Sequence, residues 1–230
     1  MGIFSKKSDG DTPVVALPPG VINLTKESGG IKLTKDTGDV FSIIARWGRK
    51  DYDVYALVEY VDGHVEVVSC FGTTDAPHDF SMRTKDGAVV HVSGDKATSD
   101  HGGADLPQEV IRVTLNSNIR TVVPVVYSAK NSGTGSFKRY GVSTYVIAGA
   151  HDTVPQSAPQ MLRVEAVNAS NNDNVYTFVP AAIINGPDGA QLLPLELYSR
   201  GGSELRPTVQ NGRVSMDSGK ENAAKPRPNH

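Results

Sequence analysis

The sequence predicts an all-β protein, an antiparallel β-sandwich of two sheets with long loops and tails of the disordered type. Short runs of β-branched and aromatic residues follow one another about every ten residues, as in sandwiches and barrels. Glycine-containing turn pairs separate several of these runs. No stretch carries an apolar stripe with helical periodicity, so we expect little helix.

The chain divides by composition into a domain and two tails. With 230 residues it has the length of one large β domain. We expect an extended tail over 1–20, a sandwich domain over 21–217 and a flexible tail over 218–230. The last segment is rich in polar residues and proline, and it has too little apolar surface to offset the entropy of ordering.

Tight turns punctuate the first half of the domain. Asp62-Gly63 and Asp86-Gly87 are pairs typical of hairpin turns, and each lies beside a β-type run. Asn23–Lys26 and Lys32–Lys35 are similar in sequence, which predicts a hairpin around Ser28-Gly29-Gly30. The strands predicted here cover 40–47, 54–61, 65–68 and 88–92.

The second half continues the same pattern. Pro124 stands inside one of its apolar runs and lacks an amide hydrogen, which predicts an edge strand or a bulge there. Trp47, at the end of an earlier run, is expected in the core. The strands predicted here cover 110–115, 121–128, 141–148, 161–167, 175–179, 192–198 and 204–209.

Charge and cysteine content exclude several classes of protein. The 23 basic and 25 acidic residues give a net charge of -2, so no basic surface for nucleic acid is expected. One cysteine, Cys70, allows no intrachain disulfide, which fits a reducing compartment. The apolar stretch near the N-terminus is too short for a secretory signal, and no apolar stretch is long enough to span a membrane. We therefore expect a cytoplasmic protein.

Carboxylates gather in two segments that could bind a hard cation. Asp51 and Asp53 precede a predicted strand, and a long glycine-containing loop over 93–109 ends in Glu109. Ca²⁺ takes six to eight oxygen ligands, and loops of this kind supply them. The alternative for Asp51 and Asp53 is a solvated turn that bonds its own backbone. The predicted metal ligands are Asp51, Asp53, Asp95, Asp100, Asp105 and Glu109.

No catalytic site is predicted. The sequence has no Gly-x-Ser-x-Gly nucleophile elbow, and its histidines lack the paired spacing of a zinc site. The glycines near Gly133 are not followed by the Lys and Ser or Thr of a phosphate loop. These features favour a binding or structural protein over an enzyme.

Several segments of the domain share motifs with one known family. Residues 51–56 are similar to an Asp-x-Asp-x-Asp motif, and 70–74 are similar to an aromatic strand that ends in paired asparagines. Residues 86–115 are similar to an acidic loop that closes in Glu. With further similarity in Asn23–Lys26, in Ser136-Phe137 and in 195–205, the chain over about 21–216 resembles the TerD family of tellurium-resistance and stress-response proteins.

The resemblance implies a two-sheet sandwich that binds Ca²⁺ at loops on one end, in a cytoplasmic protein linked to tellurite, phage and stress responses. The chain departs from the family pattern at Tyr55, Thr73 and Thr74, which replace an aspartate and two asparagines. We therefore expect a non-enzymatic protein acting by Ca²⁺-linked or partner binding. The alternative is a structural or assembly module with degenerate ion sites, docking into a homo-oligomer or a larger, phage-encoded complex.

Overall fold

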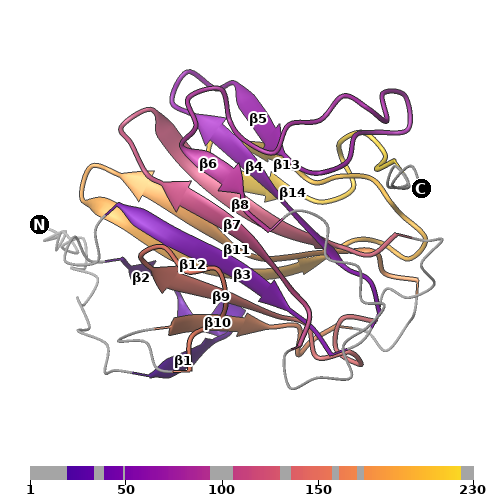
Figure 1. Cartoon of the computed structure of the whole chain (residues 1–230), viewed down its shortest axis with the longest axis horizontal. Coiled ribbons are helices and arrows are strands. Elements are labelled where there is room, and N and C mark those ends of the chain that lie inside the picture. The colour runs from indigo at the N-terminus through magenta and orange to yellow at the C-terminus, as the bar shows by residue number, and fades with distance from the viewer. Residues whose placement is uncertain are drawn as a thin grey trace, which may run out of the picture.

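The computed structural model describes residues 20–33, 39–48, 50–93, 106–129, 136–156, 161–169 and 174–223. They form two six-stranded sheets that pack face to face and a small two-stranded sheet (Figure 1). The predicted all-β sandwich is confirmed. In this part of the chain the only helix is the short 3₁₀ helix η1 (Lys26–Ser28), and no helix is long and apolar enough to cross a membrane.

The first sheet, sheet A, has β1 and β6 at its edges. All of its pairings are antiparallel except that of β1 with β10, which is parallel. In spatial order its strands are β1 (Val21–Leu24), β10 (Met161–Glu165), β9 (Ser143–Ala148), β3 (Val40–Arg46), β7 (Gln108–Thr114) and β6 (Val89–His91).

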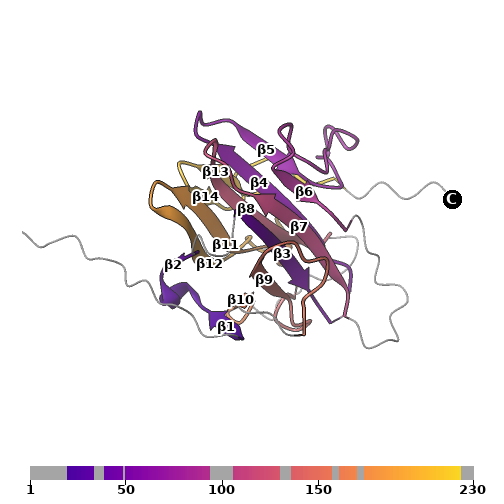
Figure 2. The same ribbon diagram turned by 60° about the vertical axis from the view of Figure 1, so that its left-hand side comes forward.

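The second sheet, sheet B, has β2 and β5 at its edges and is antiparallel throughout. In spatial order its strands are β2 (Ile31–Lys32), β12 (Gly189–Tyr198), β11 (Thr177–Gly186), β8 (Ile119–Tyr127), β4 (Asp53–Tyr60) and β5 (Val65–Val68). The small sheet is the hairpin of β13 (Thr208–Gln210) and β14 (Arg213–Ser215), which lies beside β4 in both views (Figures 1 and 2).

Sheet B is buried on both faces at β4, where every residue is buried. Val54, Ala56 and Val58 enter the core between the sheets, whereas Tyr55 and Leu57 pack into a second cluster on the outer face. This explains why the sequence of β4 is continuously apolar rather than alternating. Trp47 is buried in the intersheet core, as predicted.

The hairpin predicted between 23 and 35 is wrong. Strand β1 pairs with β10 in sheet A, whereas β2 pairs with β12 in sheet B, so the chain crosses from one sheet to the other between them. Helix η1 makes this crossing and is closed by a hydrogen bond from the Thr25 amide to the Ser28 hydroxyl. A turn signal predicts where the chain reverses, but distant partners decide which sheet each strand joins.

Pro124 lies in an interior strand, since β8 stands between β11 and β4. The edge-strand interpretation is therefore wrong, and the bulge interpretation is correct. The ladder between β8 and β11 shifts between Phe178 and Ile183, opposite the stretch of β8 that contains Pro124. A proline lacks the amide hydrogen that a regular ladder needs, so the shift removes that requirement.

The C-terminal part of the described chain covers the outer face of sheet B. The buried carboxylate of Glu59 accepts hydrogen bonds from the amides of Asn211 and Gly212, at the turn between β13 and β14. Residues 218–223, which we expected to begin the flexible tail, also pack here, and Asn222 is buried. Residues 224–230 lie outside the described residues.

Candidate functional site

The carboxylate of Glu109 joins the start of β4 to β7 from inside the sandwich. Its side chain is fully buried, and Oε2 accepts a hydrogen bond from the Val54 amide at 2.7 Å. Nε2 of His91, also buried, lies 3.4 Å from the same oxygen. Ile111 shares the face of β7 with Glu109 and belongs to the intersheet core. Two segments of the predicted ion site are therefore adjacent.

Asp53 faces the other side of sheet B. It shares a face of β4 with Tyr55, in the outer cluster, and is paired across the ladder with Tyr127. Burial raises the pKa of Tyr127, and so do its hydrogen bond to Glu204 and the nearby charges of Glu204 and Asp53. The carboxylates of Asp53 and Glu109 thus approach the start of β4 from opposite faces.

Half of the predicted ligand set belongs to the described structure. Asp51, Asp53 and Glu109 are described, whereas Asp95, Asp100 and Asp105 lie outside the described residues. The chain on either side of that stretch stays close to Glu109, because the Val110 amide donates to the Ser93 hydroxyl at 2.9 Å. Within the described ranges, no three His, Cys, Asp or Glu side chains form a group that could hold a metal.

Tyr55, Thr73 and Thr74 contact residues 205–223, which we call the C-terminal clasp. The guanidinium of Arg206 lies 5.2 Å from the centroid of the Tyr55 ring. Thr73 forms a β-bridge with Asn222 of the clasp. Tyr55 and Thr73 therefore both contact the clasp.

Arg206 is the centre of the clasp and is buried. Its Nε donates to Oδ1 of Asn222 at 2.6 Å, and Nη2 donates to the carbonyls of Phe71 and Gly72 at 3.0 and 2.8 Å. Gly72 must be glycine, since a Cβ there would lie 2.1 Å from the Ala76 carbonyl oxygen. Burial lowers the pKa of Arg206 from its ordinary value. Sequence reasoning missed this residue, which stands in an ordinary predicted strand.

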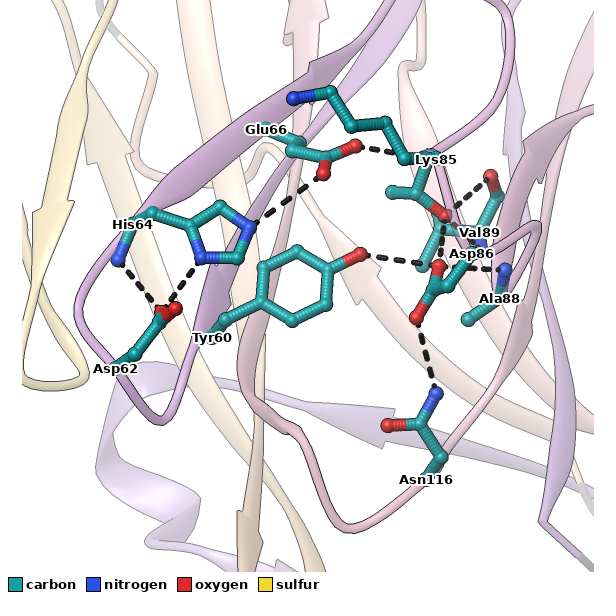
Figure 3. A network of polar contacts seen from close by, with 10 residues as sticks. Tyr60, Asp62, His64, Glu66, Lys85, Asp86, Ala88, Val89 and Asn116 are labelled. Atoms are coloured by element: carbon teal, nitrogen blue, oxygen red, sulfur yellow. Dashed lines mark hydrogen bonds and ion pairs between the residues drawn. The ribbon is translucent and has the colours of Figure 1, made fainter.

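A polar network occupies the opposite end of β4 (Figure 3). The rings of Tyr60 and His64 stack with centroids 4.2 Å apart. Nδ1 of His64 lies 2.6 Å from Asp62, and Nε2 lies 3.5 Å from Glu66. The Lys85 amide donates to Glu66 at 2.8 Å, which links the hairpin of β4 and β5 to the chain before β6. A cavity of about 570 Å³ opens among these residues.

Asp86 ties this network together. Its Oδ1 accepts from the Tyr60 and Thr84 hydroxyls and from the Ala88 amide, and its Oδ2 accepts from the Asn116 side chain. Burial opposes ionisation, but these hydrogen bonds outweigh it and lower the pKa of Asp86. Burial raises the pKa of Tyr60 to about 12. The two Asp-Gly turns were predicted separately, but no sequence signal placed them side by side.

Replacing Asp86 by alanine is expected to cost about 1 kcal/mol of unfolding free energy near neutral pH, as for other carboxylates that cap a turn. Because its pKa is lowered on folding, this contribution is complete above the ordinary Asp pKa and is lost as the pH falls through the folded value. Urea unfolding of both proteins at about pH 7 and about pH 2 measures it.

The control is Asp79→Ala, because Asp79 is exposed and lies in the same loop. The difference between Asp86→Ala and the original chain should shrink in acid, whereas the Asp79 variant should match the original at both pH values. A difference that is equally large in acid would contradict a role for the ionised carboxylate.

Comparison with known proteins gives matches in fold alone. No protein-family model matches the sequence, and no curated protein matches it. The crystal structure of the "unknown function protein SAV2460" is 13% identical, with 72% of this chain and 91% of that chain covered and a TM-score of 0.47. A homologue of the telluride resistance protein TerD, SCO6318 from Streptomyces coelicolor A3(2), is 14% identical, with 71% and 89% covered and a TM-score of 0.41. Such likenesses assign no site or activity to this chain.

Proposed function

We propose that this chain is a non-enzymatic, TerD-like protein of a cytoplasmic stress or tellurite-resistance system, acting by Ca²⁺-linked or partner binding at the loop end of the sandwich. The hydrogen bond from the Val54 amide to Glu109 supports this most directly, since it joins the strand that follows Asp51 to the residue that closes the acidic loop. Carboxylate oxygens are the ligands that Ca²⁺ prefers.

The described carboxylates fit part of a Ca²⁺ shell. Asp53 and Glu109 are buried on opposite faces of sheet B, so one ion would have to sit at the rim where β4 begins. Six to eight oxygens are needed, and the described residues provide too few. The remaining ligands would come from Asp95, Asp100 and Asp105, which follow Ser93 in sequence.

Calorimetric titration of chelator-stripped protein with Ca²⁺ tests the proposal, together with thermal unfolding with and without the ion. A ligand of the folded state raises stability by about 2.7 kcal/mol at a hundredfold excess over its Kd. Asp53→Asn should lose most of this stabilisation because it removes a charge that the ion needs. Asp62→Asn, at the opposite end of the sandwich, should retain it. Absence of both binding heat and a shift in Tm would refute Ca²⁺ binding.

The second candidate is an assembly module with degenerate ion sites that docks into a homo-oligomer or a larger, phage-encoded complex. Two observations favour it: Glu109 is already engaged by the Val54 amide and His91, and Tyr55 lies under the clasp. Size-exclusion chromatography with light scattering, run with Ca²⁺ and with chelator, separates the candidates. A monomer stabilised by Ca²⁺ supports the first, and a metal-indifferent oligomer supports the second.

A further inference from the structure

The clasp leaves a hollow beside β5 on the outer face of sheet B. A cavity of about 390 Å³ lies there, with an apolar floor of Leu57, Val65 and Val67. Val65 is 40% exposed although it faces the same side of the sheet as the buried Leu57. The clasp forms a wall that includes Arg206, Pro207, Val209 and Lys220. We call this cavity the β5 groove.

A neighbouring segment occupies the edge of β5 beside the groove. Val68 forms a parallel bridge with Ser81, and the Ser69 amide donates to the Ser81 carbonyl at 2.8 Å. Next to this bridge, the Lys85 amide donates to the carboxylate of Glu66 at 2.8 Å. Because the edge is taken, a further strand has no ladder to join. The groove therefore binds through side chains, and a compact ligand fits it better than an extended segment.

The lining of the groove carries positive charge and no negative charge. Arg206 and Lys220 belong to it, whereas none of the described residues that line it is Asp or Glu. Glu59 is the cross-strand partner of Val65, but its buried carboxylate already accepts hydrogen bonds from two amides of the β13–β14 turn. An acidic ligand would therefore meet opposite charge in the groove.

The charge of Arg206 has no ionised partner in the described part of the chain. Nε and Nη2 donate to the Asn222 side chain and to two backbone carbonyls, all of them neutral, and Nη1 has no hydrogen bond to a described residue. Burial lowers the pKa of Arg206, and the phenols of Tyr55 and Tyr127 oppose this. Burial raises the pKa of both phenols, so neither is ionised near neutral pH. A buried cation without an opposite charge is costly, so a carboxylate beside it is favoured.

Lys220 supplies a second cation at the rim. Its Nζ lies 2.9 Å from Oδ2 of Asp75, and the two side chains are 67% and 60% exposed. Exposed pairs of this kind contribute about 0–1 kcal/mol. The ammonium group can therefore turn toward a ligand at little cost.

We propose that the β5 groove binds a small carboxylic acid with an apolar body. The apolar part lies on Leu57, Val65 and Val67, and the carboxylate lies between Arg206 and Lys220, where it accepts from Nη1 of Arg206. The cavity volume falls within the range of about 300–1,000 Å³ of small-ligand pockets. Such binding requires neither Ca²⁺ nor assembly, and it goes beyond both proposed functions.

Octanoate is the probe, and calorimetric titration of the full chain in chelator measures its binding. We expect saturable binding with a Kd on the order of 0.1 mM, as for a ligand of this size and ordinary efficiency. Octanol keeps the apolar chain without the charge and should bind at least about tenfold more weakly. Octylammonium, with the opposite charge, should bind more weakly still.

Two outcomes of these titrations contradict the proposal. Equal binding of octanoate and octanol would overturn the assignment of a carboxylate to Arg206 and Lys220. Absence of saturable binding up to about 5 mM octanoate would overturn the ligand class altogether. Failure of Ca²⁺ binding or of self-association leaves octanoate binding untouched, so the proposals are tested separately.

Two variants place the ligand in the groove. Lys220→Glu reverses the charge at the rim and should weaken octanoate binding at least about fivefold while octanol binding stays within about twofold. Val65→Asp puts a charge on the apolar floor and should weaken octanoate binding at least about tenfold. Thermal unfolding shows whether each variant is folded, and Lys220→Glu, at an exposed position, remains informative should Val65→Asp fail to fold.

Each variant has a matched control elsewhere on the sandwich. Lys26→Glu matches Lys220→Glu, since Lys26 is an exposed lysine that also pairs with a carboxylate. Val21→Asp matches Val65→Asp, since Val21 is 45% exposed on the edge strand β1. Both controls should bind octanoate within about twofold of the original chain. Equal weakening by a variant and its control, or full binding by both groove variants, would overturn the location.

Discussion

Replacement of Arg206 by alanine is expected to lower the free energy of unfolding by about 4 kcal/mol. The change removes the donors that satisfy the Phe71 and Gly72 carbonyls and Oδ1 of Asn222. A buried acceptor left without its donor costs about 1–3 kcal/mol. It also removes the cation from the faces of Tyr55 and Phe71.

The effect should be concentrated in the clasp. Urea denaturation measures the total loss, and limited proteolysis with mass spectrometry reports whether cleavage begins within 205–223. Arg213→Ala is the control, since Arg213 is exposed on β14 in the same segment, and surface changes of this kind usually stay within about 0.5 kcal/mol. Equal losses in the two variants, or cleavage elsewhere first, would contradict the assigned role of Arg206.

Local sequence pattern predicted most of the strands. The strand predicted over 65–68 has those bounds as β5, and Asp62-Gly63 does form the turn before it, with φ of 90° at Gly63. These features depend on residues near one another in sequence, which propensity and turn chemistry describe. The fold class followed because each strand carried the same local signal.

The local sequence pattern did not predict which strands pair across long distances in the chain. Asn23–Lys26 and Lys32–Lys35 look alike, but their partners are β10 and β12, far along the chain. The polar composition after Asp217 predicted a tail, but Asn222 is held by Arg206, and Lys220 pairs with Asp75. Composition reports the average apolar surface of a segment and misses specific bonds of this kind.

The candidate site was also predictable only in part, because its residues were visible in the local sequence but their relative positions depend on long-range pairing. Acidic side chains at two loop-to-strand junctions indicated one end of the sandwich, and the contact of Glu109 with the Val54 amide brings those junctions together. The face of sheet B on which each carboxylate lies depends on strand register. The sequence does not determine this register, so the placement of Asp53 and Glu109 on opposite faces of sheet B was not predicted.

Glu109→Ala is expected to lower the free energy of unfolding by about 3 kcal/mol, because it strips the buried Val54 amide and His91 of their partner. Glu109→Gln keeps an oxygen for the Val54 amide and should cost about 1 kcal/mol. Chemical denaturation in chelator measures both. Glu165→Ala is the control, since Glu165 is only partly buried and pairs with Arg163, and such pairs contribute about 0–1 kcal/mol.

The glutamine variant also separates the two roles open to Glu109. If the carboxylate only joins the sheets, Glu109→Gln should leave any Ca²⁺-induced rise in Tm unchanged. If it also binds the ion, the variant should lose that rise while it stays folded, because an amide carries no charge to offset that of the cation. An alanine variant as stable in chelator as the original chain would contradict the structural role, and a Ca²⁺-induced rise in Tm that Glu109→Gln retains in full would contradict the ion-binding role.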